Sequence, residues 1–374
     1  MYRAPPFFTR RILIVKTSAL GDIVQSFVIL NYLKKKFPDV EIDWVVEKRF
    51  ASIVKAHPQV SRAIEFESKA WKSGQFREYF RAIKELRGRS YDFVFDLQGN
   101  CKSGIATLLS KGRCKVGFGW KNVREWPNLL ATNLRFELPS HLNIRLQLLA
   151  LVQQALGDCT LLPTSFDDVC FRISLEETMR IEALLNKVPR KKRIMVCPGS
   201  KWKNKQLPFN TLSQFLDKIA SSMEVSFFFI WGNAEERKCC EELQQKFKGN
   251  SVVVDKLELP VWQNLMAEMQ IVIAFDSGAL HLAGTTSTPT FSIFGPTMPE
   301  IFKPLGAGHF SVRGECPYQR KFEKQCSLLR SCPSGACIRN LEVKEIFNLF
   351  EKWKISIDSQ NRCGSPPTGS PAEL

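Results

Sequence analysis

The chain alternates between short apolar runs and longer segments in which apolar residues recur every three or four positions. The short runs are rich in Val, Ile and Phe, which is typical of strands buried on both faces of a parallel sheet. The longer segments have the period of helices with one apolar face. We expect strands at 12–15, 41–46, 63–66, 91–97, 193–197, 225–231, 251–254, 271–274 and 290–296, and helices at 23–37, 50–55, 69–87, 141–156, 210–222, 235–247, 259–269 and 341–353. Residues 117–125 are expected to form a loop.

The order of these segments predicts the fold class. Two successive arrays of strands and helices predict an α/β protein with two Rossmann-like domains facing across a cleft. We place an extension at 1–10, a first domain at 11–165 and a second at 166–340, with a polar linker around 157–168. A helix at 341–356 is expected to cross back onto the first domain. The Ser-, Pro- and Gly-rich residues 357–374 predict a disordered tail.

Composition narrows the class of protein. The chain has 374 residues, 44% hydrophobic and 24% charged, as in an ordinary globular protein of two domains. No apolar run approaches the length of a membrane span, and the proline-broken N-terminus does not read as a secretory signal, so we expect a cytoplasmic protein. The 12 cysteines are scattered through a chain large enough to build its own core, and we expect reduced thiols.

The formal net charge of +16 predicts a polyanionic partner. The candidates are nucleic acid, an anionic membrane surface and a phosphorylated substrate. No helix-turn-helix, zinc-finger or RNP-type pattern accompanies the charge, so nucleic acid ranks last. A basic stretch with interleaved aromatic residues, 69–87, reads either as a solvated helix or as a basic lip beside the cleft.

The turn at 16–22 has the strongest local signal. It joins an apolar strand to a helix, and such turns lie at the carboxyl edge of a parallel sheet, where open α/β folds bind substrates. Gly21 is expected to let the backbone approach a ligand. Asp22 falls in the first turn of the helix, where it either caps the helix or presents a carboxylate to the cleft as a general base. Lys102, after the strand at 91–97, is predicted to point to the same edge.

Two strand-end turns in the second half predict a phosphate site. Ser200 and Lys205 lie in a turn whose amides and ammonium suit a diphosphate. The turn Asp276-Ser277-Gly278 opens a helix, whose N-terminus favours an anion. His281 lies one turn further into the helix. It either contacts a ligand or is a buried histidine bonded to a backbone carbonyl, and the sequence leaves both interpretations open.

Four segments resemble the ADP-heptose:lipopolysaccharide heptosyltransferases, glycosyltransferase family 9, and are most like its heptosyltransferase I members. They are 16–22 (KTSALGD), 42–47 (IDWVVE), 96–99 (DLQG) and 276–282 (DSGALHL), and the likeness spans 11–310 in the right order. The resemblance implies a GT-B fold. It also implies metal-free, inverting transfer of heptose from ADP-heptose to a Kdo-bearing lipopolysaccharide inner-core acceptor.

The resemblance also implies residue roles. Asp22 would be the base and Lys205 would neutralise the diphosphate of the leaving ADP. The implied donor-binding residues are Ser200, Glu235, Glu236, Asp276, Ser277, Gly278 and His281, and the acceptor-binding residues are Ser18, Gly21, Lys69, Lys72, Arg77, Lys102 and Arg124. The implied partners are the nucleotide sugar, the anionic glycolipid and, transiently, the inner face of the cytoplasmic membrane.

Several alternatives stay open. One is a related GT-B transferase with another sugar or acceptor, another a nucleotide-sugar epimerase, which needs no lipid acceptor. A third is a non-catalytic scaffold on anionic lipid, which needs no carboxylate opposite a diphosphate pocket. No metal is expected, because no Asp-x-Asp pair ends a strand. Of Cys316, Cys326, Cys332 and Cys337, only the last two have a C-x₂₋₄-C spacing, so the two such pairs of a structural zinc site are not present.

Overall fold

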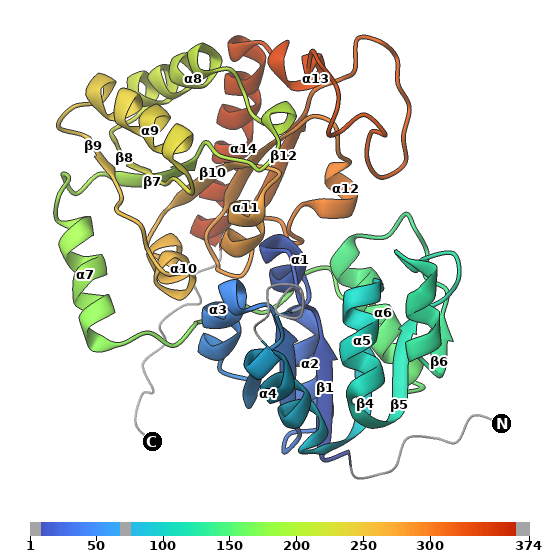
Figure 1. Cartoon of the computed structure of the whole chain (residues 1–374). Coiled ribbons are helices and arrows are strands. Elements are labelled where there is room, and N and C mark those ends of the chain that lie inside the picture. The colour runs from blue at the N-terminus through green and yellow to red at the C-terminus, as the bar shows by residue number, and fades with distance from the viewer. Residues whose placement is uncertain (1–8, 68–75, 364–374) are drawn as a thin grey trace, which may run out of the picture.

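The computed structural model describes residues 9–67 and 76–363. The chain forms two α/β halves, one above the other (Figure 1), with a six-stranded sheet in each. Every strand pair within these sheets is parallel. The predicted class, two Rossmann-like domains of a GT-B protein, is confirmed.

The first sheet has the strand order β3-β2-β1-β4-β5-β6. Its strands are β1 (Arg11–Val15), β2 (Glu41–Val46), β3 (Arg62–Glu65), β4 (Ser90–Asp96), β5 (Lys111–Phe118) and β6 (Leu134–Phe136). The central strand β1 is buried on both sides, and Ile12 aligns with Ile42 of β2 and Phe93 of β4. The apolar run that predicted this strand is therefore the centre of the sheet.

Helices cover both faces of the first sheet. One face carries α1 (Leu20–Gln25), α2 (Val28–Lys36), the short η1 (Lys48–Phe50), α3 (Ala51–Ala56) and α6 (Ile144–Ala155). The other carries α4 (Phe76–Arg87) and α5 (Cys101–Leu109), whose Ala82, Leu86 and Ala106 pack on Leu13 and Val15. A 3-10 helix, η2 (Trp126–Ala131), lies beside α5.

The second sheet repeats this order as β12-β11-β10-β7-β8-β9. Its strands are β7 (Lys192–Cys197), β8 (Val225–Phe229), β9 (Ser251–Val253), β10 (Ile271–Phe275), β11 (Thr290–Phe294) and β12 (His309–Arg313). Its helices are α7 (Leu175–Leu185), η3 (Lys203–Lys205), α8 (Phe209–Ser222), α9 (Ala234–Lys246), α10 (Leu259–Ala267), α11 (Gly278–Ala283), α12 (Pro299–Phe302), α13 (Ala336–Arg339) and α14 (Val343–Cys363).

One hydrophobic core runs through both halves. Residues of β7 alternate between two clusters: Ile194 and Val196 face α8, α9 and α14, whereas Met195 and Cys197 join the cluster that also holds Ile12 and Ile14 of the first sheet. Helices α1 and α11 pack against each other where the halves meet. The two domains are thus joined by apolar packing as well as by the linker.

Several elements differ from the sequence prediction, among them α7, which was not predicted. Strands β5, β6 and β12 were not predicted, and the loop expected at 117–125 begins with the end of β5. The helix expected at 23–37 is two helices, because at the break the Ser26 and Phe27 amides donate three residues back, to the carbonyl oxygens of Ile23 (3.0 Å) and Val24 (3.1 Å). None of these changes the sheet order around the strand ends that the motifs occupy.

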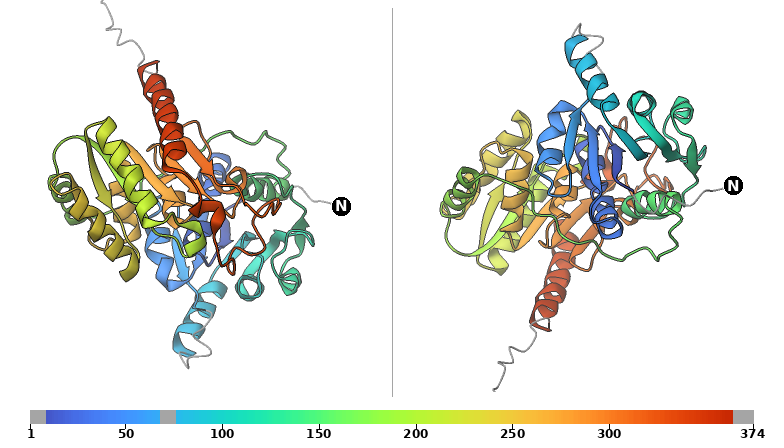
Figure 2. Two further views of the ribbon diagram at one scale, coloured as in Figure 1. Left: turned by 90° about the horizontal axis from the view of Figure 1, so that it is seen from above. Right: turned by 90° about the horizontal axis from the view of Figure 1, so that it is seen from below.

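The C-terminal helix corrects two expectations. The predicted helix 341–356 was expected to pack on the first domain, but the buried residues of α14, among them Phe350 and Trp353, belong to the core of the second sheet. The helix also continues to Cys363, through part of the predicted tail, and projects from the molecule in the views of Figure 2. Residues 364–374 lie outside the described part of the chain.

Among the described residues, no helix combines the length and the apolarity that crossing a bilayer requires.

The segment after the linker is anchored through a buried histidine, which gives a pH prediction. His57 is buried, its ring packs on Phe27 and Phe171, and burial lowers the pKa of His57 to about 3, with the Arg172 cation adding to the effect. The folded protein therefore binds fewer protons than the unfolded chain below about pH 6.5, so stability falls as the pH is lowered.

We predict that His57→Asn flattens this dependence. Between about pH 6.5 and pH 5, the variant should lose about 1–2 kcal/mol less unfolding free energy than the parent. Chemical denaturation at several pH values measures the difference, with the exposed His141→Asn as the matched control. An unchanged slope in His57→Asn would show that His57 does not carry this dependence.

Candidate functional site

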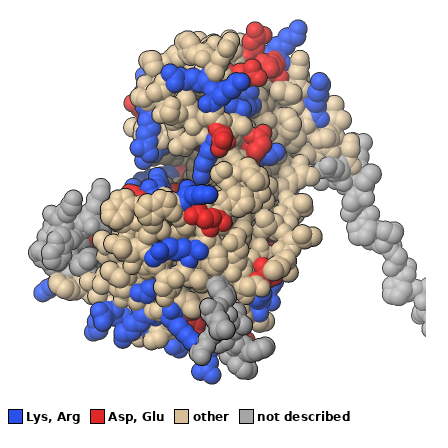
Figure 3. All heavy atoms as spheres, turned by 90° about the vertical axis from the view of Figure 1, so that its right-hand side faces the viewer, with Lys and Arg blue, Asp and Glu red and all other residues tan. Residues whose placement is uncertain are grey.

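The carboxyl ends of the two sheets face each other across a notch. Figure 3 shows this notch between the upper and lower halves, with blue Lys and Arg side chains along its walls. Turns after β1, β4 and β5 supply one wall and turns after β7, β8, β10 and β11 the other. The strand-end turns singled out in the sequence are therefore brought together.

Asp22 lies on the first-domain wall, in the first turn of α1. Its Oδ2 accepts a long hydrogen bond from the Ala19 amide (3.4 Å), and Nη1 of Arg124 lies 3.9 Å away. Both side chains of this ion pair are partly exposed. The capping contact and the cleft-facing carboxylate thus coexist, so one interpretation of Asp22 does not exclude the other.

Two further lysines lie near this carboxylate: Lys16, which opens the 16–22 motif but was given no role in the sequence analysis, and Lys324, which lies in no motif. Lys16 is buried and donates to the Leu97 carbonyl oxygen (2.6 Å); burial lowers the pKa of Lys16, while Asp22 opposes that shift. Lys324 is solvent-accessible, yet the protein around it lowers the pKa of its ammonium, again opposed by Asp22. Asp22 therefore lies in a strongly cationic setting.

Lys324 reaches this setting through backbone pairing. Residues Thr297 and Gln325 form an antiparallel bridge, and the Cys326 amide donates to the Pro296 carbonyl oxygen (2.8 Å). These bonds lay the segment 324–326 along the chain that leaves β11. The position of Lys324 depends on that pairing, for which the sequence carries no visible signal.

On the second-domain wall, Lys205 and Asp276 form a buried ion pair. Oδ2 of Asp276 also accepts a hydrogen bond from the Thr297 hydroxyl (2.7 Å). Burial is the largest single effect and would raise the pKa of Asp276, but the Lys205 ammonium, His281 and the Thr297 hydroxyl together outweigh it, so the pKa is lowered. Since an ammonium has three N–H donors, Lys205 is held in place and still has donors for a ligand.

Small residues complete this wall. Ser200 is buried and donates to the Asp276 carbonyl oxygen (3.3 Å), so the β7 turn is tied to the β10 turn. The Ser277 hydroxyl, at the N-cap of α11, is buried without a hydrogen-bond partner among the described residues. Gly278 packs on Leu20 of the first domain, where an added Cβ would lie 3.0 Å from Leu20 Cδ2.

The two glutamates that were predicted together have different surroundings. Glu236 accepts from the Gly232 amide (2.6 Å) and packs against Gly199, where an added Cβ would fall 2.2 Å from its carboxyl carbon. Glu235 instead forms an exposed ion pair with Lys203 (3.1 Å). Of the two, Glu236 is the one that borders the strand-end turn.

His281 occupies the junction between the domains. It is buried, with Gln25 Nε2 3.1 Å from its Nε2 and Arg145 Nη2 3.4 Å from its Nδ1. Burial lowers the pKa of His281 to about 3, and the Arg145 cation acts in the same direction, so the ring is neutral. The structure therefore agrees with the interpretation of a buried histidine, although its partners are the side chains of Gln25 and Arg145 and not a backbone carbonyl. A contact between His281 and the nucleotide-sugar donor stays a prediction.

Gly21 makes room for this ring. An added Cβ on Gly21 would lie 2.6 Å from His281 Cδ2. The sequence analysis assigned the glycine to the close approach of a ligand, but in the structure the group that approaches is His281 of the other domain.

The remaining predicted acceptor residues are spread around the first-domain wall. The Ser18 amide donates to Gln98 Oε1 (3.3 Å), and Lys102 is exposed at the start of α5. Arg77 is exposed on α4, whereas Lys69 and Lys72 lie outside the described residues. The structure brings Arg124 close to Asp22. The acceptor-binding roles assigned to Lys69, Lys72, Arg77 and Lys102 stay predictions.

The cysteine segment forms a cavity of its own. Cys316, Cys326, Cys332 and Cys337 line a cavity of about 280 Å³, and the cysteines whose side chains are described have free thiols. Within the described part of the chain, no three His, Cys, Asp or Glu side chains are grouped as metal ligands.

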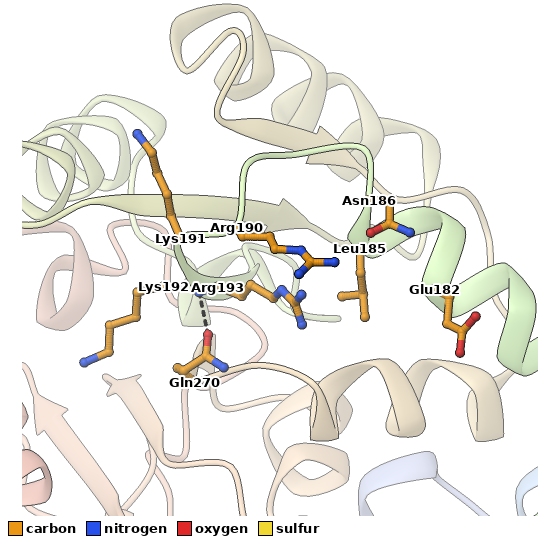
Figure 4. A pocket seen from close by; sticks show the side chains of 8 residues that line it. All are labelled: Glu182, Leu185, Asn186, Arg190, Lys191, Lys192, Arg193 and Gln270. Atoms are coloured by element: carbon orange, nitrogen blue, oxygen red, sulfur yellow. Dashed lines mark hydrogen bonds between the residues drawn. The ribbon is translucent and has the colours of Figure 1, made fainter.

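A second hollow lies at the amino-terminal edge of the second sheet, opposite the edge that carries the strand-end turns (Figure 4). It measures about 610 Å³; Arg190 and Arg193 point into it, and Lys191 points away. The Arg193 amide donates to Gln270 Oε1 (2.7 Å). It is built from the amino ends of β7 and β10, so it is remote from the strand-end turns.

Two Rossmann-like domains with charged strand-end turns on both walls of a notch define an α/β protein of the GT-B class. The sequence profile of glycosyltransferase family 9 (heptosyltransferase) matches residues 79–331. The chain belongs to this family and is a glycosyltransferase of the heptosyltransferase type.

Relatives and solved structures agree with this assignment. The chain is 29% identical to lipopolysaccharide heptosyltransferase 1 of Campylobacter coli, over 77% of this chain and 84% of that protein. It is 27% identical to the Pseudomonas aeruginosa enzyme of the same name, over 85% and 87%. A heptosyltransferase of Escherichia coli solved with ADP superposes with a TM-score of 0.74, at 22% identity, covering 92% and 99% of the two chains, and shares the fold.

The contact between Gly21 and His281 gives a stability prediction. Gly21→Ala places a methyl group inside the His281 ring contact, and overpacking of this kind typically costs about 1–3 kcal/mol. The measurement is the free energy of unfolding. Gly308→Ala is the matched control, because the nearest atoms to its Cβ would be 3.8 Å away. Equal stability of the two variants would argue against a rigid contact.

Proposed function

We propose that the protein transfers heptose from ADP-heptose to the Kdo of a lipopolysaccharide inner-core acceptor, with inversion at the anomeric carbon and without a metal ion. The observation that carries the proposal is the pair of opposed groups: Asp22 on one wall and the Lys205–Asp276 pair on the other. The family assignment supports the heptosyl group, and an E. coli heptosyltransferase solved with an ADP-heptose analogue supports the donor class.

Asp22 would act as the general base. An acceptor hydroxyl beside its carboxylate would lose its proton to Asp22 as the oxygen bonds to the anomeric carbon of the donor. The bond from that carbon to the diphosphate oxygen breaks, and ADP leaves with the electron pair from the opposite face. A single displacement of this kind inverts the anomeric centre, and it needs the base and the leaving group on opposite walls.

Lys205 would stabilise the negative charge that develops on the departing diphosphate. Preorganised cations in a partly dry site are effective here, because they need not reorganise during the reaction. Asp276 and Thr297 hold the lysine through their shared contacts. The Ser277 hydroxyl, which has no hydrogen-bond partner among the described residues, would donate to a phosphate oxygen, and Glu236 would contact the ribose.

The cationic surroundings of Asp22, to which both domains contribute, would hold the anionic acceptor. Arg124 and Lys324 flank Asp22, and both would attract the carboxylate or phosphate groups of an inner-core glycolipid. An acceptor of this kind is embedded in a bilayer, so we place the protein on the cytoplasmic face of the inner membrane, as a peripheral protein.

The direct test supplies purified protein with ADP-heptose and Kdo-bearing lipid A and determines the product masses. The expected product is the acceptor plus one heptosyl unit, formed together with ADP. Turnover of the donor in the absence of acceptor would instead indicate a nucleotide-sugar epimerase. No change in either substrate would contradict the proposal.

Asp22→Asn separates capping from catalysis. Asparagine caps a helix about as well as aspartate, but it does not accept a proton at neutral pH. Since general-base assistance is typically worth about 10²–10⁴-fold, kcat should fall at least about a hundredfold while the melting temperature and the affinity for ADP are kept. Steady-state kinetics, thermal unfolding and calorimetric ADP titration measure the three quantities. A near-parental kcat would leave Asp22 with the capping role alone.

Metal chelation tests the second part of the proposal. Because Lys205 supplies the positive charge for the diphosphate, activity should be unchanged after EDTA treatment and gel filtration. The assay compares initial rates before chelation, after chelation, and after adding back magnesium or manganese. Loss of activity on chelation with recovery on metal addition would contradict metal-free transfer.

A further inference from the structure

A cluster of exposed apolar side chains lies on the first domain, outside the site. Of the twelve large apolar side chains that are exposed among the described residues, six fall between residues 80 and 130. Four of them belong to two adjacent helices: Ile105 and Leu108 of α5, and Trp126 and Leu130 of η2. We call these four residues the α5–η2 face.

The two helices form one continuous surface. Gly104 of α5 packs on η2, where an added Cβ would lie 3.4 Å from Asn128 Cα and 3.7 Å from Ala131 Cβ. Ile105 and Leu108 are three residues apart and therefore share one side of the helix. The inward side of α5, including Ala106, is buried on the sheet, so the apolar stripe is additional to the residues that the fold needs.

Cations border the same surface. Residues 101–135 contain seven Lys or Arg residues and one acidic residue, Glu125. The Lys115 ammonium donates to the Leu108 carbonyl oxygen (2.9 Å), and the Arg135 guanidinium donates to the Leu129 carbonyl oxygen (2.6 Å). These contacts hold positive charge beside Leu108 and Leu130. Apolar residues with a cationic border and a tryptophan match a surface that enters the interface of an anionic bilayer.

The face also borders the site. Helix α5 begins at the carboxyl end of β4, on the side of the first domain that faces the second (Figure 1). Arg124, which lies 3.9 Å from Asp22, is two residues from Trp126. A bilayer on this face would therefore lie at the rim of the notch, within reach of a glycolipid head group.

We propose that the α5–η2 face docks on an anionic phospholipid bilayer through its apolar side chains, with the bordering cations facing lipid head groups. The orientation of the notch toward the acceptor rests on the proposed function, but the docking itself does not. The cationic border favours an anionic bilayer over a second copy of this chain, because two identical faces with net positive charge repel each other.

The test measures partition of the full chain onto vesicles of phosphatidylcholine with about one quarter phosphatidylglycerol, in the absence of nucleotide sugar and acceptor. The variant is Leu108→Gln/Leu130→Gln, at positions 62% and 78% exposed. Loss of two inserted leucines should reduce the partition coefficient at least about tenfold. Vesicles of phosphatidylcholine alone should bind the parent protein more weakly, because they lack the anionic charge.

The matched control is Leu175→Gln/Met179→Gln on α7, where the side chains are 77% and 60% exposed and no comparable cluster surrounds them. It should partition as the parent does. Thermal unfolding checks that both double variants are folded. A second readout is quenching of tryptophan fluorescence by brominated lipids, which should decrease in Trp126→Phe.

Equal partition of the two double variants would overturn the proposal. A parent dimer in sedimentation that the Leu108→Gln/Leu130→Gln variant abolishes would also overturn it, and would assign the face to self-association. Failure of the proposed function is distinguishable, because it would leave vesicle binding intact while no heptosyl product forms. With a lipid-free acceptor, the face variant should retain parental activity.

Discussion

The ring of His281 lies against the backbone of Gly21, and this contact joins the two domains where α1 packs on α11 beside the notch. It joins the first turn of α1 to the middle of α11, immediately beside Asp22 on one side and near Asp276 on the other. Burial keeps the ring neutral, which is what allows it to sit between Arg145 and Gln25 without adding another charge to the junction. Glycine at position 21 is thus required by packing between domains.

Around that junction the charges contribute little net stability. A buried ion pair such as Lys205–Asp276 is weak evidence of stabilisation, because desolvation offsets much of its attraction. Near Asp22 the positive charges outnumber this single carboxylate, and burial lowers the pKa of both Lys16 and Lys324. An anion in the notch would offset the excess positive charge and give a partner to the Ser277 hydroxyl, which has none among the described residues.

Sequence patterns predicted the parts of this arrangement that are local. The buried runs located β1, β2, β4, β7 and β10, and the turns after them carry the site residues, because parallel strands end at a common edge. Strands β5 and β12 were missed: β5 mixes lysines and glycines with its apolar residues, and β12 is mostly half-buried. An edge position alone does not explain these misses, because the edge strands β3 and β9 were predicted; periodicity failed where polar residues interrupt the apolar run.

The non-local parts were beyond prediction from one sequence. Gly21 and His281 are 260 residues apart, and a motif identifies neither as the other's partner. Lys324 approaches Asp22 because the chain after β11 pairs with 324–326 in an antiparallel bridge, which is a tertiary contact between two irregular segments. Because parallel strands end at a common edge, the sequence predicts which residues share one edge of one sheet. It does not predict which segment of the other domain packs against that edge. The cationic wall around Asp22 is therefore built partly by the second domain, so the position of one domain relative to the other determines how many cations surround this carboxylate.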